Sequence, residues 1–171
     1  RLTRSLALSI ALQQIPVLFL RTEEQARKTV DLMISEVLNK NIAALSYEKR
    51  SKARTTIDKA YSDFKPYVKL VDKFYKPDVL VDSIRALVEH HHTKVVIVDH
   101  LQSLLAPLEG HTGKIDKLMG ELQRFAVSQD IVLILACQLS RTNNNRVSLQ
   151  DGDKPRLSDL KGSASIEQVA D

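Results

Sequence analysis

The sequence predicts an α/β protein in which one parallel sheet carries helices on both faces. Runs of consecutive apolar residues, many of them β-branched, are typical of strands buried on both sides, and VVIV (95–98) and IVLILAC (131–137) are the clearest examples. Segments with helical periodicity separate these runs, and helices of several turns are the usual connections between parallel strands. With 171 residues, the chain has the size of one three-layer domain.

The first half of the chain alternates in this way. Residues 4–14 predict a helix and 16–21 (PVLFLR) a short buried strand. Residues 23–40 repeat their apolar side chains at helical spacing. Residues 46–62 follow Ser46, a residue type favoured at helix starts, and predict a Lys- and Arg-rich helix. Acidic residues are interleaved with its cations, so we expect a solvated face.

The second half continues the alternation. We predict a strand over 67–71, a helix over 78–91, a strand over 94–98, a helix over 114–128 and a strand over 131–137. Two polar stretches interrupt the pattern, and they cover residues 106–113 and 140–156. The second stretch is long for a compact domain, and such loops are either functional or simply disordered surface.

Composition limits the class of protein. The formal net charge of +4 and pI of about 9.2 permit a polyanionic partner without requiring one. Cys137 is the only cysteine, which excludes an intrachain disulfide, fits a reducing compartment and predicts a small buried hydrophobe. No apolar run reaches the roughly 20 residues that cross a bilayer. His90, His91 and His92 predict a polar helix end rather than a metal site.

Polar residues follow three of the predicted strands. Glu23 lies beyond the strand at 16–21, Asp99 ends the strand at 94–98, and Gln138 follows the strand at 131–137. Each has an ordinary explanation: a first-turn acid favoured by the helix dipole, a helix N-cap and a surface amide. The carboxyl ends of neighbouring parallel strands, however, line one crevice where ligands bind. A metal-binding acid, a water-activating acid and a phosphate-sensing amide would meet there.

Four segments give the chain a specific resemblance. They are LFLRTEE (18–24), VVIVDHLQSLL (95–105), ILACQLSR (134–141) and RLSDLKGSASIEQVAD (156–171). In this order and spacing the chain resembles the RecA-like motor domain of DnaB-type replicative hexameric DNA helicases, a group with phage, bacterial and mitochondrial members. VVIVDHLQSLL resembles the Walker B segment of that family, and 156–171 is the most specific match.

The resemblance implies roles for individual residues. Asp99 would coordinate Mg²⁺, Glu23 would polarise the water that attacks ATP, and Gln138 would sense the γ-phosphate and couple it to the following loop. That loop and residues 106–114 would face the channel of a ring and contact single-stranded DNA. The implied DNA-binding residues are Arg141, Asn143, Asn144, Asn145, Arg146, Lys154, Arg156, Lys161, Gly162 and Ser163. Cations, amides and backbone N–H groups suit a phosphate chain bound without sequence preference.

A phosphate-binding loop of the form GxxxxGK[ST] is absent from the sequence. The family places this motif just before the helix that begins near Ser5. Either the chain is a fragment that begins inside the motif, or the motif has degenerated and Arg4 and Ser5 stand in for its lysine and hydroxyl. We favour a fragment, in which the first strand of the fold and the last, arginine-finger strand are lacking. We expect such a chain not to hydrolyse ATP alone.

The function that follows is the motor of an ATP-dependent replicative DNA helicase, which translocates on single-stranded DNA and unwinds duplex. The resemblance implies a hexameric ring, ATP and Mg²⁺ as ligands, and a primase or helicase loader as partner. The expected location is a bacterial or phage-infected cytoplasm or the mitochondrial matrix. Two alternatives remain: another RecA-like recombination ATPase, against which residues 156–171 argue, and a non-catalytic RecA-like module with a degenerate nucleotide site that binds DNA or partner subunits.

Overall fold

The computed structural model describes residues 1–21, 24–72, 76–108, 112–138 and 166. Its centre is a parallel sheet in the order β2-β1-β3-β4. The strands are β1 (Val17–Arg21), β2 (Val68–Val71), β3 (Val95–Asp99) and β4 (Val132–Ala136). The predicted parallel sheet is confirmed, and each strand lies within a residue or two of its predicted position.

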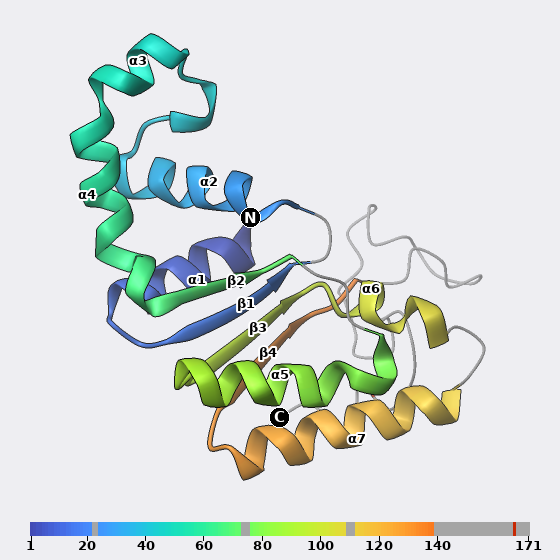
Figure 1. Cartoon of the computed structure of the whole chain (residues 1–171). Helices are drawn as coiled ribbons and strands as arrows, with labels where there is room; N and C mark the ends of the chain where they lie inside the picture. Colours follow the sequence, from blue (N-terminus) through green and yellow to red (C-terminus); the bar gives the residue numbers. More distant parts are fainter. Residues whose placement is uncertain (22–23, 73–75, 109–111, 139–165, 167–171) are drawn as a thin grey trace, which may run out of the picture.

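Helices cover both faces of this sheet, as Figure 1 shows. One face carries α1 (Leu2–Leu12), α2 (Ala26–Leu38) and α4 (Arg54–Phe64), while α5 (Pro77–His91) and α7 (Thr112–Ser128) lie on the other. Shorter elements complete the described chain: α3 (Tyr47–Lys52), α6 (Leu101–Leu105) and the 3₁₀ turns Ile42–Ala44, Lys65–Tyr67 and Ala106–Leu108. The predicted three-layer α/β fold is therefore confirmed.

Alternation along the strands explains why they are apolar throughout. Successive side chains of a strand point to opposite faces, so a strand covered on both sides needs apolar residues at every position. In β3, Val96 and Val98 belong to the cluster under α5, α6 and α7, whereas Val95 and Ile97 belong to the cluster under α1, α2 and α4. All four are at most 8% exposed. The sheet thus separates two hydrophobic cores.

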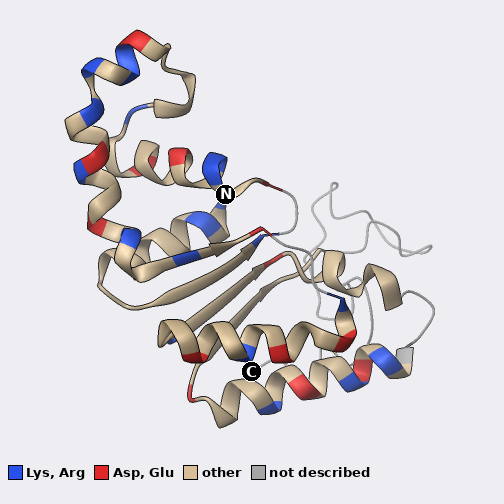
Figure 2. Cartoon of the chain, viewed as in Figure 1, with Lys and Arg blue, Asp and Glu red and all other residues tan. Residues whose placement is uncertain are grey.

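The helix predicted over 46–62 is two helices, and this prediction was wrong in its continuity. The chain turns at Ala53, which has φ −93° and ψ 6° and ends α3. α3 buries none of its residues, whereas α4 buries Ile57, Ala60 and Phe64 against the sheet. Charged side chains cover both helices (Figure 2), which confirms the predicted solvated face. The turn lets α4 pack its apolar side on the core while α3 stays at the surface.

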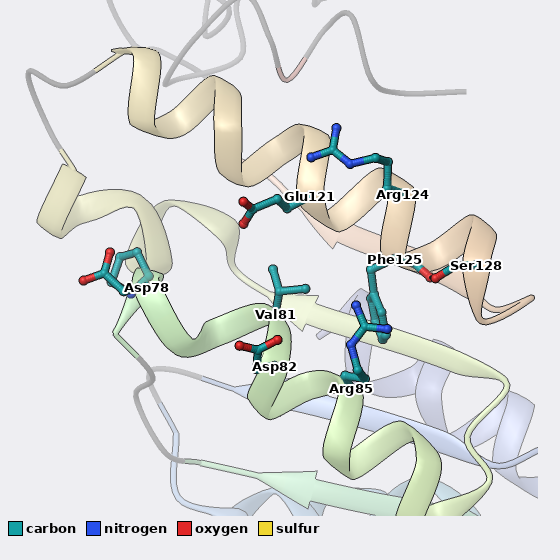
Figure 3. Close-up of a pocket in the computed structure, with 9 residues that line it drawn as sticks. Asp78, Val81, Asp82, Arg85, Glu121, Arg124, Phe125 and Ser128 are labelled. Atoms are coloured by element: carbon teal, nitrogen blue, oxygen red, sulfur yellow. The ribbon is translucent and has the colours of Figure 1, made fainter.

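The layer formed by α5 and α7 contains a groove between the two helices. Val81 and the buried Phe125 lie among its lining residues, and the guanidinium of Arg85 lies 5.1 Å from the centre of the Phe125 ring (Figure 3). A cation over an aromatic face is attractive. The groove encloses about 400 Å³, and none of the residues predicted to carry function lines it.

Two smaller predictions can be compared with the structure. The histidine run forms the end of α5, where His92 closes the helix in the left-handed conformation, as expected of a polar helix end. Among the described residues no cluster of three potential metal-binding side chains occurs. Cys137 is only half-buried, because it lies beyond the last residue of β4, and partial desolvation raises the pKa of its thiol. No helix in the described ranges has the length and apolarity that crossing a membrane requires.

Candidate functional site

The carboxyl ends of β1, β3 and β4 meet at one edge of the sheet. Arg21 at the end of β1 is in register with Asp99 at the end of β3, and Asp99 is in register with Ala136 of β4. Two of the three predicted strand-end residues, Asp99 and Gln138, therefore lie at the same edge. The crevice expected from the sequence is formed by these strand ends.

Asp99 is bound by a residue from the other end of the described chain. Thr3, in the first turn of α1, donates a 2.5 Å hydrogen bond from its Oγ1 to Oδ2 of Asp99. Four buried residues of β3 precede Asp99, so the carboxylate leaves the core at a fixed point and is itself half-buried. A carboxylate and a hydroxyl are both hard oxygen ligands, which is the chemistry that Mg²⁺ prefers. The pair fits a magnesium site in which water completes the coordination.

The beginning of α1 supplies a second feature of this site. No side chain caps its first turn, so backbone N–H groups there keep their capacity to donate. These groups and the positive end of the helix dipole attract anions such as phosphate. The hydrogen bond from Thr3 to Asp99 connects this helix start to the strand ends.

Arg4 and Ser5, predicted as stand-ins in a phosphate loop, have other partners in this structure. The Nε and Nη2 atoms of Arg4 donate to Oε1 of Glu36 on α2 at 3.0 and 2.5 Å. Ser5 donates its hydroxyl to the backbone oxygen of Arg1. Their nucleotide-binding role stays a prediction, and the hydroxyl that contacts the β3 acid is that of Thr3. Sequence reasoning overlooked Thr3 because it searched for an intact motif rather than for any hydroxyl in the first turn.

Gln138 is held by the residues that follow Asp99. Its backbone N–H donates to Oε1 of Gln102 at 2.9 Å, and its backbone oxygen accepts from Nε2 of Gln102 at 3.3 Å. Its side-chain Nε2 lies 3.2 Å from Nε2 of His100, which also lies 3.0 Å from Oγ of Ser103. Gln102 and His100 were part of the quoted motif, but no role had been inferred for either.

Glu23 lies outside the described residues, so its predicted catalytic role is untested by geometry. Its described neighbours form a charged cluster in which Arg21 bonds both Glu24 and Thr29, and Lys28 pairs with Glu24 at 3.0 Å. Partial burial alone would raise the pKa of Glu24. The hydrogen bonds and positive charges of Lys28 and Arg21 outweigh it and hold this pKa below its usual value.

All the predicted DNA-binding residues also lie outside the described part of the chain. These are Arg141, Asn143, Asn144, Asn145, Arg146, Lys154, Arg156, Lys161, Gly162 and Ser163. Only Ile166 is described in the segment that gave the most specific resemblance, and it is 4% exposed in the core beneath α5 and α7. This one residue of the segment therefore packs in the main core.

The fold and the strand-end site define the chain as a RecA-like α/β domain. One solved ATPase domain covers 98% of this chain, which in turn covers 61% of that structure, with a TM-score of 0.77 and 24% identity. A DnaB-like replicative helicase, solved to show its interactions with primase, covers 96% of this chain and is itself covered over 41%, with a TM-score of 0.72 and 21% identity. At these identities the likeness shows the fold.

The family follows from the sequence comparison. The model of the DnaB-like helicase C-terminal domain matches residues 1–171, and the chain belongs to this family. A probable plasmid replicative DNA helicase of Chlamydia muridarum is 28% identical over 177 residues, which is 97% of this chain and 37% of that protein. The chain thus spans little more than a third of that relative.

Proposed function

We propose that the chain acts as the motor of an ATP-dependent replicative DNA helicase. The observation that carries this proposal is the Thr3–Asp99 pair, because it joins the uncapped start of α1 to the acid at the end of β3. A phosphate site and a magnesium-binding acid are thereby brought together at the carboxyl edge of a parallel sheet. Membership of the DnaB-like helicase family supports the same function.

The described residues suggest how the site would handle ATP. The first-turn N–H groups of α1 would bind phosphate oxygens, and Asp99 and Thr3 would hold Mg²⁺ through oxygen and water. Bound Mg²⁺ neutralises charge on the β- and γ-phosphates and orients them. Glu23 would orient and deprotonate the attacking water. Gln138, exposed beside β4, would donate from its amide to the γ-phosphate.

The partners of the motor belong to the same proposal. The segment after Gln138 carries the cations and amides expected to track the phosphates of single-stranded DNA. A ring of identical subunits, with a hexamer as the family expectation, would place these segments around one strand. A structurally similar DnaB-like helicase interacts with primase, and we propose a primase or loader as a partner here. The predicted bacterial, phage or mitochondrial location remains a prediction.

The experiment is a comparison of DNA-stimulated ATP hydrolysis by the full-length protein and its variants. Glu23→Gln should lower kcat by about 10²–10⁴-fold, the typical contribution of a general base. Asp99→Asn should lower it at least about tenfold, because the amide is a weaker ligand for Mg²⁺. Asp58→Asn is the matched control, since Asp58 is an exposed acid on α4 paired with Arg54. Equal rates in all four proteins would refute the proposal.

A further inference from the structure

We propose that Gln102 is a positioning residue that fixes the orientation of Gln138 relative to Asp99. This inference deepens the proposed function and rests on it, because it takes Gln138 as the residue that contacts the γ-phosphate. It concerns a different side chain, however, for which the sequence analysis inferred no role. The three residues lie at the carboxyl edge of β3 and β4.

Gln102 completes a backbone pairing that the sheet leaves unfinished. The ladder between β3 and β4 ends with Asp99 opposite Ala136. Two residues later, Gln138 would have no strand partner on this side, but the side-chain amide of Gln102 supplies one. Its Oε1 accepts from the Gln138 N–H at 2.9 Å, and its Nε2 donates to the Gln138 oxygen at 3.3 Å. A primary amide offers the same donor and acceptor as a peptide group, so the side chain extends the ladder beyond the end of β3.

The amide of Gln102 is presented from a firm support. α6 begins immediately after His100, and its residues Leu101, Leu104 and Leu105 are at most 5% exposed in the core. A short helix anchored by three buried leucines has little freedom to move. Gln102 lies between these anchors, so its amide is fixed relative to Asp99, three residues earlier in the chain.

Gln138 is also contacted through its side chain. Nε2 of Gln138 lies 3.2 Å from Nε2 of His100, the residue next to Asp99. Two of the three residues after Asp99 therefore hold Gln138, one by its backbone and one by its side-chain amide. A displacement of Asp99 when nucleotide binds would reach Gln138 by this path, and from there the segment that follows it. Gln102 is the link that a substitution can remove without altering Asp99 or Gln138.

The test uses the full-length protein with three variants. Gln102→Ala removes both hydrogen bonds, and Gln102→Glu keeps an acceptor for the Gln138 N–H while it loses the donor to the oxygen. Gln13→Ala is the matched control, because Gln13 also donates to a backbone oxygen, that of Ser9, at the far end of α1. The measurements are kcat and KM for ATP with single-stranded DNA, and hydrogen exchange of peptides that contain Gln138.

We expect Gln102→Ala to lower kcat about tenfold while KM for ATP stays within about twofold, since one or two neutral hydrogen bonds are lost at a residue that acts on the reacting phosphate. The Gln138 amide should lose its protection from exchange in this variant. Gln102→Glu should keep this protection and recover much of the rate, and Gln13→Ala should match the wild type in both measurements. A residue that only stabilised the fold would not separate kcat from KM in this way.

The possible failures are distinct. A wild-type rate in Gln102→Ala, or unchanged exchange at Gln138, would overturn the positioning role and leave the proposed function standing. A parallel change of kcat and KM in Gln102→Ala would also overturn it, because it would indicate a general loss of folded protein or of binding. A wild-type protein without DNA-stimulated ATPase would overturn the proposed function and the positioning role together.

Discussion

At the scale of single residues, the hydroxyl of Thr3 is the feature on which the candidate site depends. Its 2.5 Å hydrogen bond to Asp99 is of the charge-assisted kind, which is short and stronger than a bond between neutral groups. It fixes the rotamer of a carboxylate that would otherwise turn freely at the end of β3. When Mg²⁺ is bound, the same two oxygens are the ones near enough to share it, so both the free and the occupied site use Thr3.

Replacing Thr3 by valine, which has nearly the same shape, should therefore weaken Mg²⁺ binding about 10–100-fold, the usual effect of losing a group that orients a ligand. Thr3→Ser keeps the hydroxyl and should stay close to wild type. The measurement is a Mg²⁺ titration of ATP hydrolysis by the full-length protein. If the valine and serine variants need the same Mg²⁺ concentration, the hydroxyl has no part in metal binding.

The sequence predicted Asp99 and Gln138 correctly as neighbours, because strand direction alone decides which ends meet. It did not identify Thr3, because only the rotation of a helix decides which of several nearby side chains faces the site. Successive residues of a helix are about 100° apart, so Thr3 and Ser5 point to nearly opposite sides. Arg4 lies between them in direction and reaches Glu36 instead. Helical phase of this kind is set by packing against the sheet.

At the scale of elements, the connection from β1 to α2 is held by a cluster of charges. Arg21 at the end of β1 bonds Glu24 and the fully buried Thr29, and Lys28 joins Glu24 from the first turns of α2. The cluster ties together the two elements on either side of Glu23. Because these charges lower the pKa of Glu24, the cluster is expected to depend on pH.

The sign of this dependence follows from linkage. The pKa of Glu24 is lower in the folded protein than in the unfolded chain, so its contribution to stability is present above the ordinary glutamate pKa of about 4.5 and is lost as pH falls through the folded value. Glu24→Gln should reduce the free energy of unfolding at pH 7 by up to about 1 kcal/mol and have little effect near pH 3. Urea denaturation at both pH values measures this difference.

Glu48→Gln is the control for that prediction, because Glu48 pairs with Lys52 while both side chains remain well exposed. Its effect on stability should be small at both pH values. A Glu24→Gln effect that is equally large at pH 3 and pH 7 would mean that packing, rather than charge, accounts for the contribution of Glu24.

The break between α3 and α4 shows what local sequence does not contain. Ala53, where the chain turns, is among the strongest helix formers, so propensity predicts continuity there. The turn accompanies a tertiary interaction in which Arg50 of α3 forms an ion pair with Asp31 of α2. That pair raises the pKa of the Arg50 guanidinium, against the smaller opposing effect of its partial burial. Contacts between elements, rather than residues within one, thus decide where this helix ends.

At the scale of the whole molecule, the sheet divides the apolar core into two parts. Ile84 of α5 lies in the cluster on one face, and Ile34 of α2 lies in the cluster on the other. Strand periodicity made this division predictable, because residues buried at every position require cover on both sides. The sequence did not predict which helix covers which face, since the hand and order of the connections are properties of the folded chain.

This division predicts independence of the two layers. Ile84→Val and Ile34→Val should each lower the free energy of unfolding by about 0.5–1.5 kcal/mol, because each removes one buried methylene. In the double variant the losses should add to within about 0.5 kcal/mol, since the two sites share no partners. Equilibrium urea unfolding of the four proteins measures this. A coupling energy above about 1 kcal/mol would show that strain passes through the sheet.

The strand order has a last consequence, which concerns the growing chain on the ribosome. β1 is made first but lies inside the sheet, between β2 and β3, which are both made later. A nascent chain that has reached only α2 would expose both edges of an apolar strand, and exposed edges of this kind favour aggregation. The bond from Thr3 to Asp99 spans 96 residues, so the site closes only after β3 has been translated. Its formation would mark the point at which the emerging chain becomes safe from misassociation.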